Sequence, residues 1–181
     1  YTGLAVGIAL VFDAISDPLV GSISDNWRSE HGRRHPFLYV SMVPMGACFF
    51  LLLSPPDLPE IGLFLWLAVF TTLTRTAMTL YHVPHVALGA ELSSDCHERT
   101  TIVAYRYFFS YVGVFTAYAI GFFLFLNDTP EFPRGQFNVQ AYSPLGLTLG
   151  ALMIVTILTA ALGTRSRIPY LPRAPSTVRR V

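Results

Sequence analysis

Residues 1–23 read YTGLAVGIALVFDAISDPLVGSI, an apolar stretch long enough to cross a lipid bilayer as one helix. Two aspartates interrupt it, Asp13 and Asp17, which are four residues apart and therefore share one face of a helix. A charged side chain at the bilayer centre costs about 2.5–3.5 kcal/mol on insertion scales, and neighbouring carboxylates also repel one another. The stretch therefore predicts a membrane helix whose aspartates bind a compensating cation or proton.

The composition of the whole chain also indicates a membrane protein. Of its 181 residues, 52% are apolar and 13% are charged, whereas soluble domains have about 25% charged residues. The mean hydropathy is +0.50. The formal net charge of +1 gives no indication of a nucleic-acid partner. Cys48 lies in an apolar stretch and Cys96 in a polar one, so we predict neither a disulfide framework nor a metal site.

Four further stretches reach the length of about 20 apolar residues that a bilayer requires. We therefore expect an all-α, polytopic membrane helix bundle with five transmembrane helices. The predicted spans are residues 1–23, 36–53, 61–90, 101–126 and 144–163. On the fourth span we expect Gly113, Ala117 and Gly121 to make a close helix–helix contact. The chain begins inside an apolar helix without Met, charged flank or cleavage signal, so we expect a fragment of a longer protein.

Arginine supplies all twelve basic residues, and its distribution predicts the orientation of the helices. On one side of the predicted bundle lie nine of them: Arg28, Arg33, Arg34, Arg99, Arg165, Arg167, Arg173, Arg179 and Arg180. The opposite side has only Arg134. Because arginine-rich loops stay in the cytoplasm, we predict that residues 164–181 form a cytoplasmic loop segment. We expect a multi-pass protein of the cell (inner) membrane.

The first span holds the predicted cation site. At a rise of about 1.5 Å per residue, Asp17 lies about 12 Å and Asp13 about 18 Å from Asp25 at the cytoplasmic end. Both aspartates are therefore close to the bilayer middle. Ser16 offers a hydroxyl oxygen on the same side of the helix. We predict that this oxygen and the carboxylates bind a monovalent cation.

The third span carries Arg75, Thr79, His82 and Val86 at spacings of four, three and four residues, which places them on one stripe of a helix. A buried Arg75 and His82 need acceptors, and the aspartates of the first span are the available carboxylates. His82 is a candidate substrate ligand or proton relay, with a hydrogen-bonded structural histidine as the alternative. For His85, one residue off the stripe, we expect helix packing or a place in the cytoplasmic cavity.

On the fourth span, Arg106 lies about 10 Å inside the cytoplasmic end at the same rise. Tyr105, Tyr107 and Tyr111 surround it, and aromatic rings beside a guanidinium suit a hydroxyl-rich or anionic ligand. Its aliphatic stem also permits the charged group to reach outward to the interface. A structural ion pair of the aspartates with Arg75 or Arg106 is the alternative to cation binding.

The loop after the first span combines Asp25 with the turn Gly32-Arg33-Arg34. A carboxylate and arginines at a cytoplasmic helix end predict a gating latch between neighbouring helices. The same arginines set the topology of the chain.

These residues resemble a known family. The runs that carry the resemblance are DAISDPLVGSISDNWRSEHGRRHPF, LYHVPHVALGAEL and ERTTIVAYRYFFSYVG. They are similar to the glycoside–pentoside–hexuronide:cation symporters of the melibiose-permease type, which belong to the major facilitator superfamily. The resemblance implies that the five spans are helices 2 to 6 of a twelve-helix transporter. Helix 1 and the C-terminal six-helix half are then absent from this sequence.

The resemblance also assigns roles to individual residues. It implies that Asp13 and Asp17 bind the cation, with Ser16 where an Asn often stands. It places Thr79 where a hydroxyl helps to bind sodium and Arg106 where an arginine contacts sugar.

Two positions depart from the melibiose pattern. His82 stands where a sugar-binding Asp is found, and Val86 replaces a stacking Trp. The run His82-Val83-Pro84 also resembles the sodium-coupled lysolipid symporters. We therefore retain Arg75, His82, Val86 and Arg106 as candidate substrate-binding residues without a melibiose-like galactoside specificity.

The function predicted on this basis is symport of a glycoside or related sugar, coupled to sodium or protons, with no catalytic residue and no cofactor. The first alternative is a sodium-coupled symporter of lysolipids or other amphiphiles. A distant alternative is an intramembrane metal-dependent enzyme using the aspartates with His82 and His85, but the acidic motif with an Ala-Arg pair is missing. A purely structural membrane protein is a further alternative, but it does not explain why two aspartates lie within a membrane span.

Overall fold

The structure is a computed structural model, and it describes residues 2–27, 29, 32–130 and 132–171. Five long helices make up most of this part of the chain: α1 (Thr2–Asn26), α2 (His35–Leu53), α3 (Glu60–Glu91), α4 (Cys96–Ala119) and α5 (Tyr142–Thr164). A π-helix, η1 (Ile120–Phe125), continues α4. Short 3-10 helices are η2 (Gly135–Phe137), η3 (Val139–Ala141) and η4 (Arg165–Tyr170). The five long helices are long and apolar enough to cross a membrane, which confirms the predicted all-α fold class.

Polar residues at the helix ends extend the helices beyond the predicted apolar spans. The helix α4 begins at Cys96, five residues before the predicted span, because Asp95 caps it: Asp95 Oδ1 accepts a hydrogen bond from the His97 N–H at 3.1 Å. The helix α1 continues to Asn26. In both cases the backbone remains helical where hydropathy alone ends the span.

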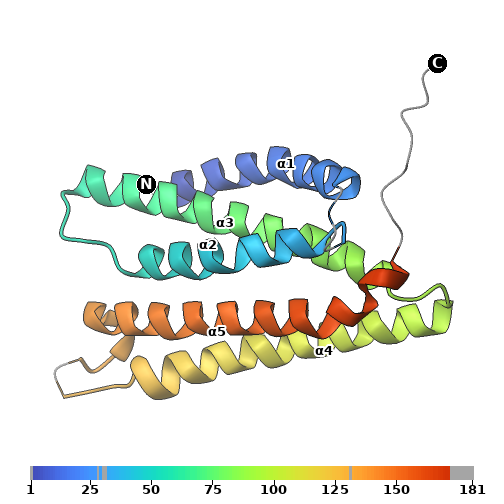
Figure 1. Ribbon diagram of the computed structural model, residues 1–181. Coiled ribbons are helices and arrows are strands. Elements are labelled where there is room, and N and C mark those ends of the chain that lie inside the picture. The colour runs from blue at the N-terminus through green and yellow to red at the C-terminus, as the bar shows by residue number, and fades with distance from the viewer. Residues whose placement is uncertain (1, 28, 30–31, 131, 172–181) are drawn as a thin grey trace.

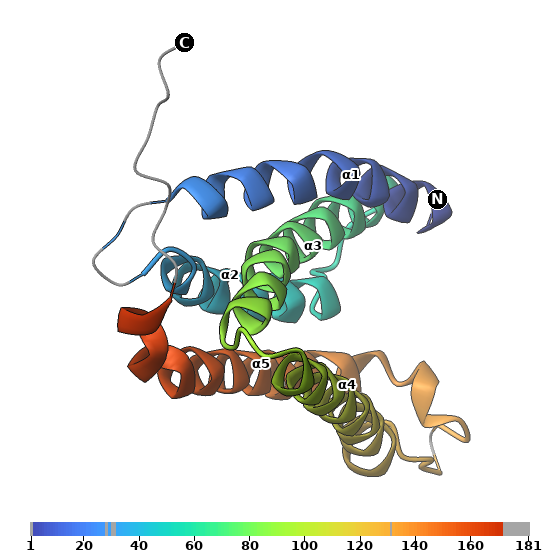
Figure 2. The same cartoon turned by 90° about the vertical axis from the view of Figure 1, so that its right-hand side faces the viewer.

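The helices lie side by side in an up-and-down order, with α1, α3 and α2 on one side and α5 and α4 on the other (Figures 1 and 2). The helix α1 packs on α3, α3 on α2, and α2 on α5. The helix α4 contacts α3, and its continuation η1 contacts α5. The C-terminal ends of α1, α3 and α5 therefore gather with the N-terminal ends of α2 and α4 (Figure 1).

This gathering places the arginine-rich segments at one end of the bundle. At that end lie Arg33, Arg34, Arg99, Arg165 and Arg167, whereas Arg134 lies in the connection between η1 and η2 at the opposite end. The predictions on Arg28, Arg173, Arg179, Arg180 and the rest of residues 172–181 lie outside the described residues. The assignment of the arginine-rich end to the cytoplasm stays a prediction.

A close helix contact joins α2 to α5 through glycines. A Cβ atom at Gly46 would lie 2.7 Å from the carbonyl oxygen of Gly150, and a Cβ at Gly150 would lie 2.7 Å from the carbonyl oxygen of Gly46. Among the described residues, a Cβ at Gly113 or Gly121 would meet no atom within 4 Å, so the close contact expected of the fourth span stays a prediction. A stripe of small residues makes a helix face smooth, but it does not determine which helix lies against it.

Candidate cation and substrate site

The charged residues in the middle of α1 and α3 contact one another. Asp13 Oδ2 accepts a hydrogen bond from Arg75 Nε at 2.6 Å and forms an ion pair with Nη2 of the same side chain. The other oxygen, Asp13 Oδ1, is buried and has no hydrogen-bond partner in the described part of the chain. The structural ion pair that was the alternative to cation binding is therefore present, and it occupies one of the two Asp13 oxygens.

The second aspartate has an uncharged partner. Thr79 Oγ1 donates a hydrogen bond of 2.7 Å to Asp17 Oδ1, and Thr79 itself is buried. Asp17 is exposed at the surface of α1. Ser16 donates its hydroxyl hydrogen to the backbone oxygen of Asp13 at 3.4 Å.

The two contacts share one register. Asp13 and Arg75 are separated by 62 residues in the chain, and so are Asp17 and Thr79. This equal offset arises because α1 and α3 run side by side in the same direction (Figure 1), so one turn along α1 corresponds to one turn along α3. We call Asp13, Asp17, Arg75 and Thr79 the mid-helix cluster.

The predicted substrate residues divide between two places. Arg75 belongs to the mid-helix cluster, and His82 is exposed on α3. Val86 and Arg106 line a cavity of about 320 Å³ between α3 and α4, to which the C-terminal end of α5 contributes Thr164. The structure therefore does not bring all four candidates around one space.

His85 and Arg106 share this cavity. The His85 ring stacks on Tyr81 with 4.9 Å between ring centroids, and its Nδ1 atom is buried without a hydrogen-bond partner among the described residues. The guanidinium of Arg106 lies 5.4 Å from the centroid of the Tyr107 ring. Tyr105 and Tyr107 are exposed on the surface of α4. The cavity thus offers a cation and an imidazole to a polar ligand.

A second charged cluster joins the ends of α1, α2 and α3. Arg34 donates to both oxygens of Glu91, with 3.1 Å from Nε to Oε2 and 2.7 Å from Nη2 to Oε1. Arg33 pairs with the same carboxylate, and Arg34 Nη2 lies 3.0 Å from Asp25 Oδ1. We call Asp25, Arg33, Arg34 and Glu91 the end cluster. The structure brings the three predicted gating residues together here.

Glu91 is a functional candidate that our reading of the sequence missed. It provides the carboxylate that both arginines contact, and its side chain is 16% exposed. The available signal was a carboxylate at the end of the third span, at the same end of the bundle as the arginine turn. Length and hydropathy place Glu91 at that end, but they do not place it against the loop between α1 and α2.

His35 is another buried polar residue that the sequence did not single out. It is fully buried at the start of α2, and its Nε2 lies 3.0 Å from Thr164 Oγ1 at the end of α5. Because the Thr164 hydroxyl donates to the Ala160 carbonyl at 2.8 Å, it accepts the hydrogen from His35 Nε2. This hydrogen bond ties α2 to α5 at the arginine-rich end.

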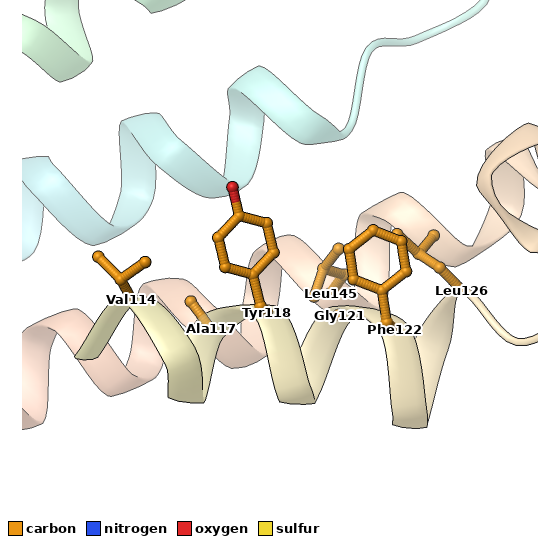
Figure 3. Close-up of a pocket in the computed structure, with 7 residues that line it drawn as sticks. All are labelled: Val114, Ala117, Tyr118, Gly121, Phe122, Leu126 and Leu145. Atoms are coloured by element: carbon orange, nitrogen blue, oxygen red, sulfur yellow. The ribbon is translucent and has the colours of Figure 1, made fainter. Parts of the chain in front are cut away.

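An apolar groove of about 430 Å³ lies along α4, η1 and the start of α5 (Figure 3). Its lining residues are Val114, Ala117, Tyr118, Gly121, Phe122, Leu126 and Leu145. None of them is a predicted site residue, and none carries a charge. The groove therefore has no charged ligand for a cation, and the candidate site is the mid-helix cluster.

Comparison with known proteins identifies the family. Residues 1–180 match the family described as MFS/sugar transport protein. The chain belongs to this family. Membership of the MFS/sugar transport family confirms the resemblance inferred from the aspartate pair and the arginine loop. It also confirms that the chain comes from a family of transporters and not of enzymes.

The chain is similar to symporters from bacteria and vertebrates. An uncharacterized symporter of Synechocystis sp. is 28% identical over 185 residues, covering 99% of this chain and 33% of that protein. An Escherichia coli protein with the name "Putative glycoside/cation symporter YagG" is 30% identical over 118 residues, covering 61% of this chain and 26% of that protein. Human sodium-dependent lysophosphatidylcholine symporter 1 is 35% identical over 127 residues, covering 69% of this chain and 23% of that protein. The chain thus spans at most 33% of the length of these relatives.

Proposed function

We propose that this chain is part of a secondary active transporter that couples the entry of a monovalent cation, sodium or proton, to the uptake of a glycoside or related sugar. The observation that carries the proposal is the mid-helix cluster. It holds two carboxylates and one guanidinium within membrane-spanning helices, and Asp13 Oδ1 is buried without a partner among the described residues. Arg75 neutralises one of the two carboxylate charges, and the other has no ion-pair partner among the described residues. Such a charge at this depth is costly, so a bound cation or proton stabilises it.

The oxygens available to the cation come from α1 and α3. They belong to Asp13, Asp17 and Thr79, with Ser16 beside them on α1. Hard cations favour oxygen ligands. Pro18 lies inside α1 and has no N–H, so the Ala14 carbonyl lacks its usual helical donor four residues on.

The substrate is expected to contact the cavity that Val86 and Arg106 line, with His82 on α3 nearer the bilayer middle. Arg75, the fourth candidate, is held by Asp13 instead. The Arg106 guanidinium, which lies 5.4 Å from the centroid of the Tyr107 ring, suits a hydroxyl-rich ligand. A lysolipid is the second candidate, because the run His82-Val83-Pro84 and the 35% identity to the human lysophosphatidylcholine symporter favour it.

Transport requires a further half of the protein. Alternating access is the rocking of two helical halves around a site at the bilayer middle, and we expect a C-terminal six-helix half to supply the facing surface. The end cluster would then latch α1, α2 and α3 together at the cytoplasmic side during this motion. Cation binding raises the affinity for the substrate, which is a coupling free energy between two ligands. We place the protein in the cell (inner) membrane.

The direct test is Asp17→Asn in the transporter at its natural full length, reconstituted in vesicles. Uptake of labelled glycosides and of labelled lysophosphatidylcholine is measured under an imposed sodium gradient or pH gradient. We expect the variant to lose gradient-driven uptake, whereas Asp57→Asn in the polar connection between α2 and α3 keeps it. Retained gradient-driven uptake in Asp17→Asn would overturn the proposal. The labelled compound that the unaltered transporter accumulates distinguishes sugar from lysolipid.

A further inference from the structure

We propose that Arg75 acts as a built-in counter-ion that occupies part of the two-aspartate site and thereby limits it to a single, weakly held coupling cation. The inference rests on the proposed function and names the residue that determines cation affinity and number. It differs from the sequence-based interpretation of Arg75 as a substrate-facing residue.

The Arg75 guanidinium is held against Asp13 by two contacts. Two of its nitrogens, Nε and Nη2, contact the same oxygen, Asp13 Oδ2. A side chain held by two contacts to one carboxylate oxygen is oriented by the aspartate and not by a ligand elsewhere. The second oxygen, Asp13 Oδ1, remains buried and unpartnered within the described residues. Arg75 therefore occupies one carboxylate oxygen of Asp13 and leaves the other oxygen for a cation.

The charges of the cluster give the expected stoichiometry. Asp13 and Asp17 contribute two negative charges and Arg75 one positive charge, while Thr79 is neutral, so one negative charge remains. One monovalent cation neutralises the cluster. Without Arg75, the two carboxylates would lie four residues apart with no positive charge paired to them among the described residues, and such a pair attracts cations more strongly and repels itself.

Because of the register of α3 against α1, the two aspartates have different partners. Arg75 and Thr79 lie one helical turn apart and face Asp13 and Asp17 in turn. The helix α3 thus places the Arg75 guanidinium against Asp13 and the uncharged Thr79 hydroxyl against Asp17. Asp17 is consequently the aspartate whose charge is left for the coupling cation. The Arg75 side chain is 40% exposed, so replacing it removes a charge without opening a fully buried cavity.

The test compares Arg75→Gln and Arg75→Lys with the unaltered full-length transporter in detergent. The measurement is binding of radioactive sodium at equilibrium, with thermal unfolding as the check on folding. We expect Arg75→Gln to bind sodium at least about tenfold more tightly, equivalent to 1.4 kcal/mol, or to bind a second sodium ion. Arg75→Lys retains the charge and should bind sodium as the unaltered protein does.

A second variant guards against a loss of folding in Arg75→Gln. The double variant Asp13→Asn with Arg75→Gln removes one charge of each sign, so the cluster keeps a single negative charge. We expect it to bind one sodium ion with an affinity close to that of the unaltered protein. Unchanged or weaker sodium binding in folded Arg75→Gln, or tighter binding in the double variant than in Arg75→Gln, would overturn the inference.

Failure of the inference is distinguishable from failure of the proposed function. If the unaltered transporter takes up its substrate in response to a cation gradient and Arg75→Gln binds sodium unchanged, only the role of Arg75 is wrong. If uptake by the unaltered transporter ignores both sodium and pH gradients, the proposed function itself is wrong and the inference falls with it.

Discussion

The mid-helix cluster and the end cluster are built from similar residues but differ in net charge. Each contains two carboxylates, and each links α1 with α3. The end cluster adds two arginines, so its four charges cancel. The mid-helix cluster adds one arginine and a threonine and keeps one negative charge. A balanced cluster suits a contact that holds helices together, whereas an unbalanced one suits a site that binds a positive ligand.

The surroundings of the two clusters strengthen this contrast. In the end cluster, Arg34 and Glu91 are 8% and 16% exposed, and both oxygens of Glu91 accept hydrogen bonds. In the mid-helix cluster, Asp13 keeps an unpartnered oxygen among the described residues, and Asp17 is exposed. Substitutions in the first cluster should therefore act mainly on stability, and substitutions in the second mainly on ligand binding.

The largest effect on stability is expected for Glu91→Gln. The change removes the charge that Arg33 and Arg34 share and leaves Arg34, which is largely buried, with Asp25 alone. Breaking a buried ion pair from one side costs about 3 kcal/mol or more. The measurement is the free energy of unfolding of the full-length protein in detergent. A loss as small as that of a typical surface substitution would remove the difference between the clusters.

A smaller effect is expected for Gly46→Ala, which tests packing without any change in charge. The new Cβ would lie 2.7 Å from the Gly150 carbonyl oxygen, and helix backbones must separate to admit it. Such overpacking costs about 1–3 kcal/mol. Gly113→Ala is the matched control, because its Cβ meets nothing within 4 Å. Equal thermal unfolding of the two variants would show that the α2–α5 contact does not depend on glycine.

For Thr79→Val we expect a change of about 1 kcal/mol, the usual contribution of one hydrogen bond. The substitution removes the donor to Asp17 Oδ1 and one oxygen near the predicted cation site. Sodium binding should weaken several-fold, and the unfolding temperature should change little. Thr79→Ser keeps the hydroxyl and should bind sodium normally. A large loss of stability without a loss of sodium affinity would instead make this contact structural, like those of the end cluster.

The smallest effect is expected for Asp25→Asn. The Asp25 side chain is 56% exposed and contacts one nitrogen of Arg34, and exposed ion pairs contribute about 0–1 kcal/mol. Unfolding should be nearly unchanged, which would show that Glu91 is the main partner of the arginines. A loss equal to that of Glu91→Gln would require the two carboxylates to act as one unit.

Much of the fold follows from local properties of the chain. Hydropathy and length predict five membrane helices, and the four-residue spacing of Asp13 and Asp17 places them on one helix face. The concentration of arginines in alternate loops predicts which helix ends gather. These properties depend on a few consecutive residues, so neighbours in the sequence are sufficient to define them.

The partners of the charged residues depend on tertiary packing. From the sequence, Arg75 and Arg106 were both open to the aspartates, and the register of α3 against α1 selects Arg75. The same packing brings Glu91 to Arg33 and Arg34, joins His35 to Thr164, and places Gly46 and not Gly113 in close contact with another helix. Contacts between helices are set by rotation and register over more than 50 residues of intervening chain. Local periodicity does not encode the rotation and register of one helix against another. The amino-acid pattern therefore identifies candidate residues, and the packing of the helices determines which of them contact one another.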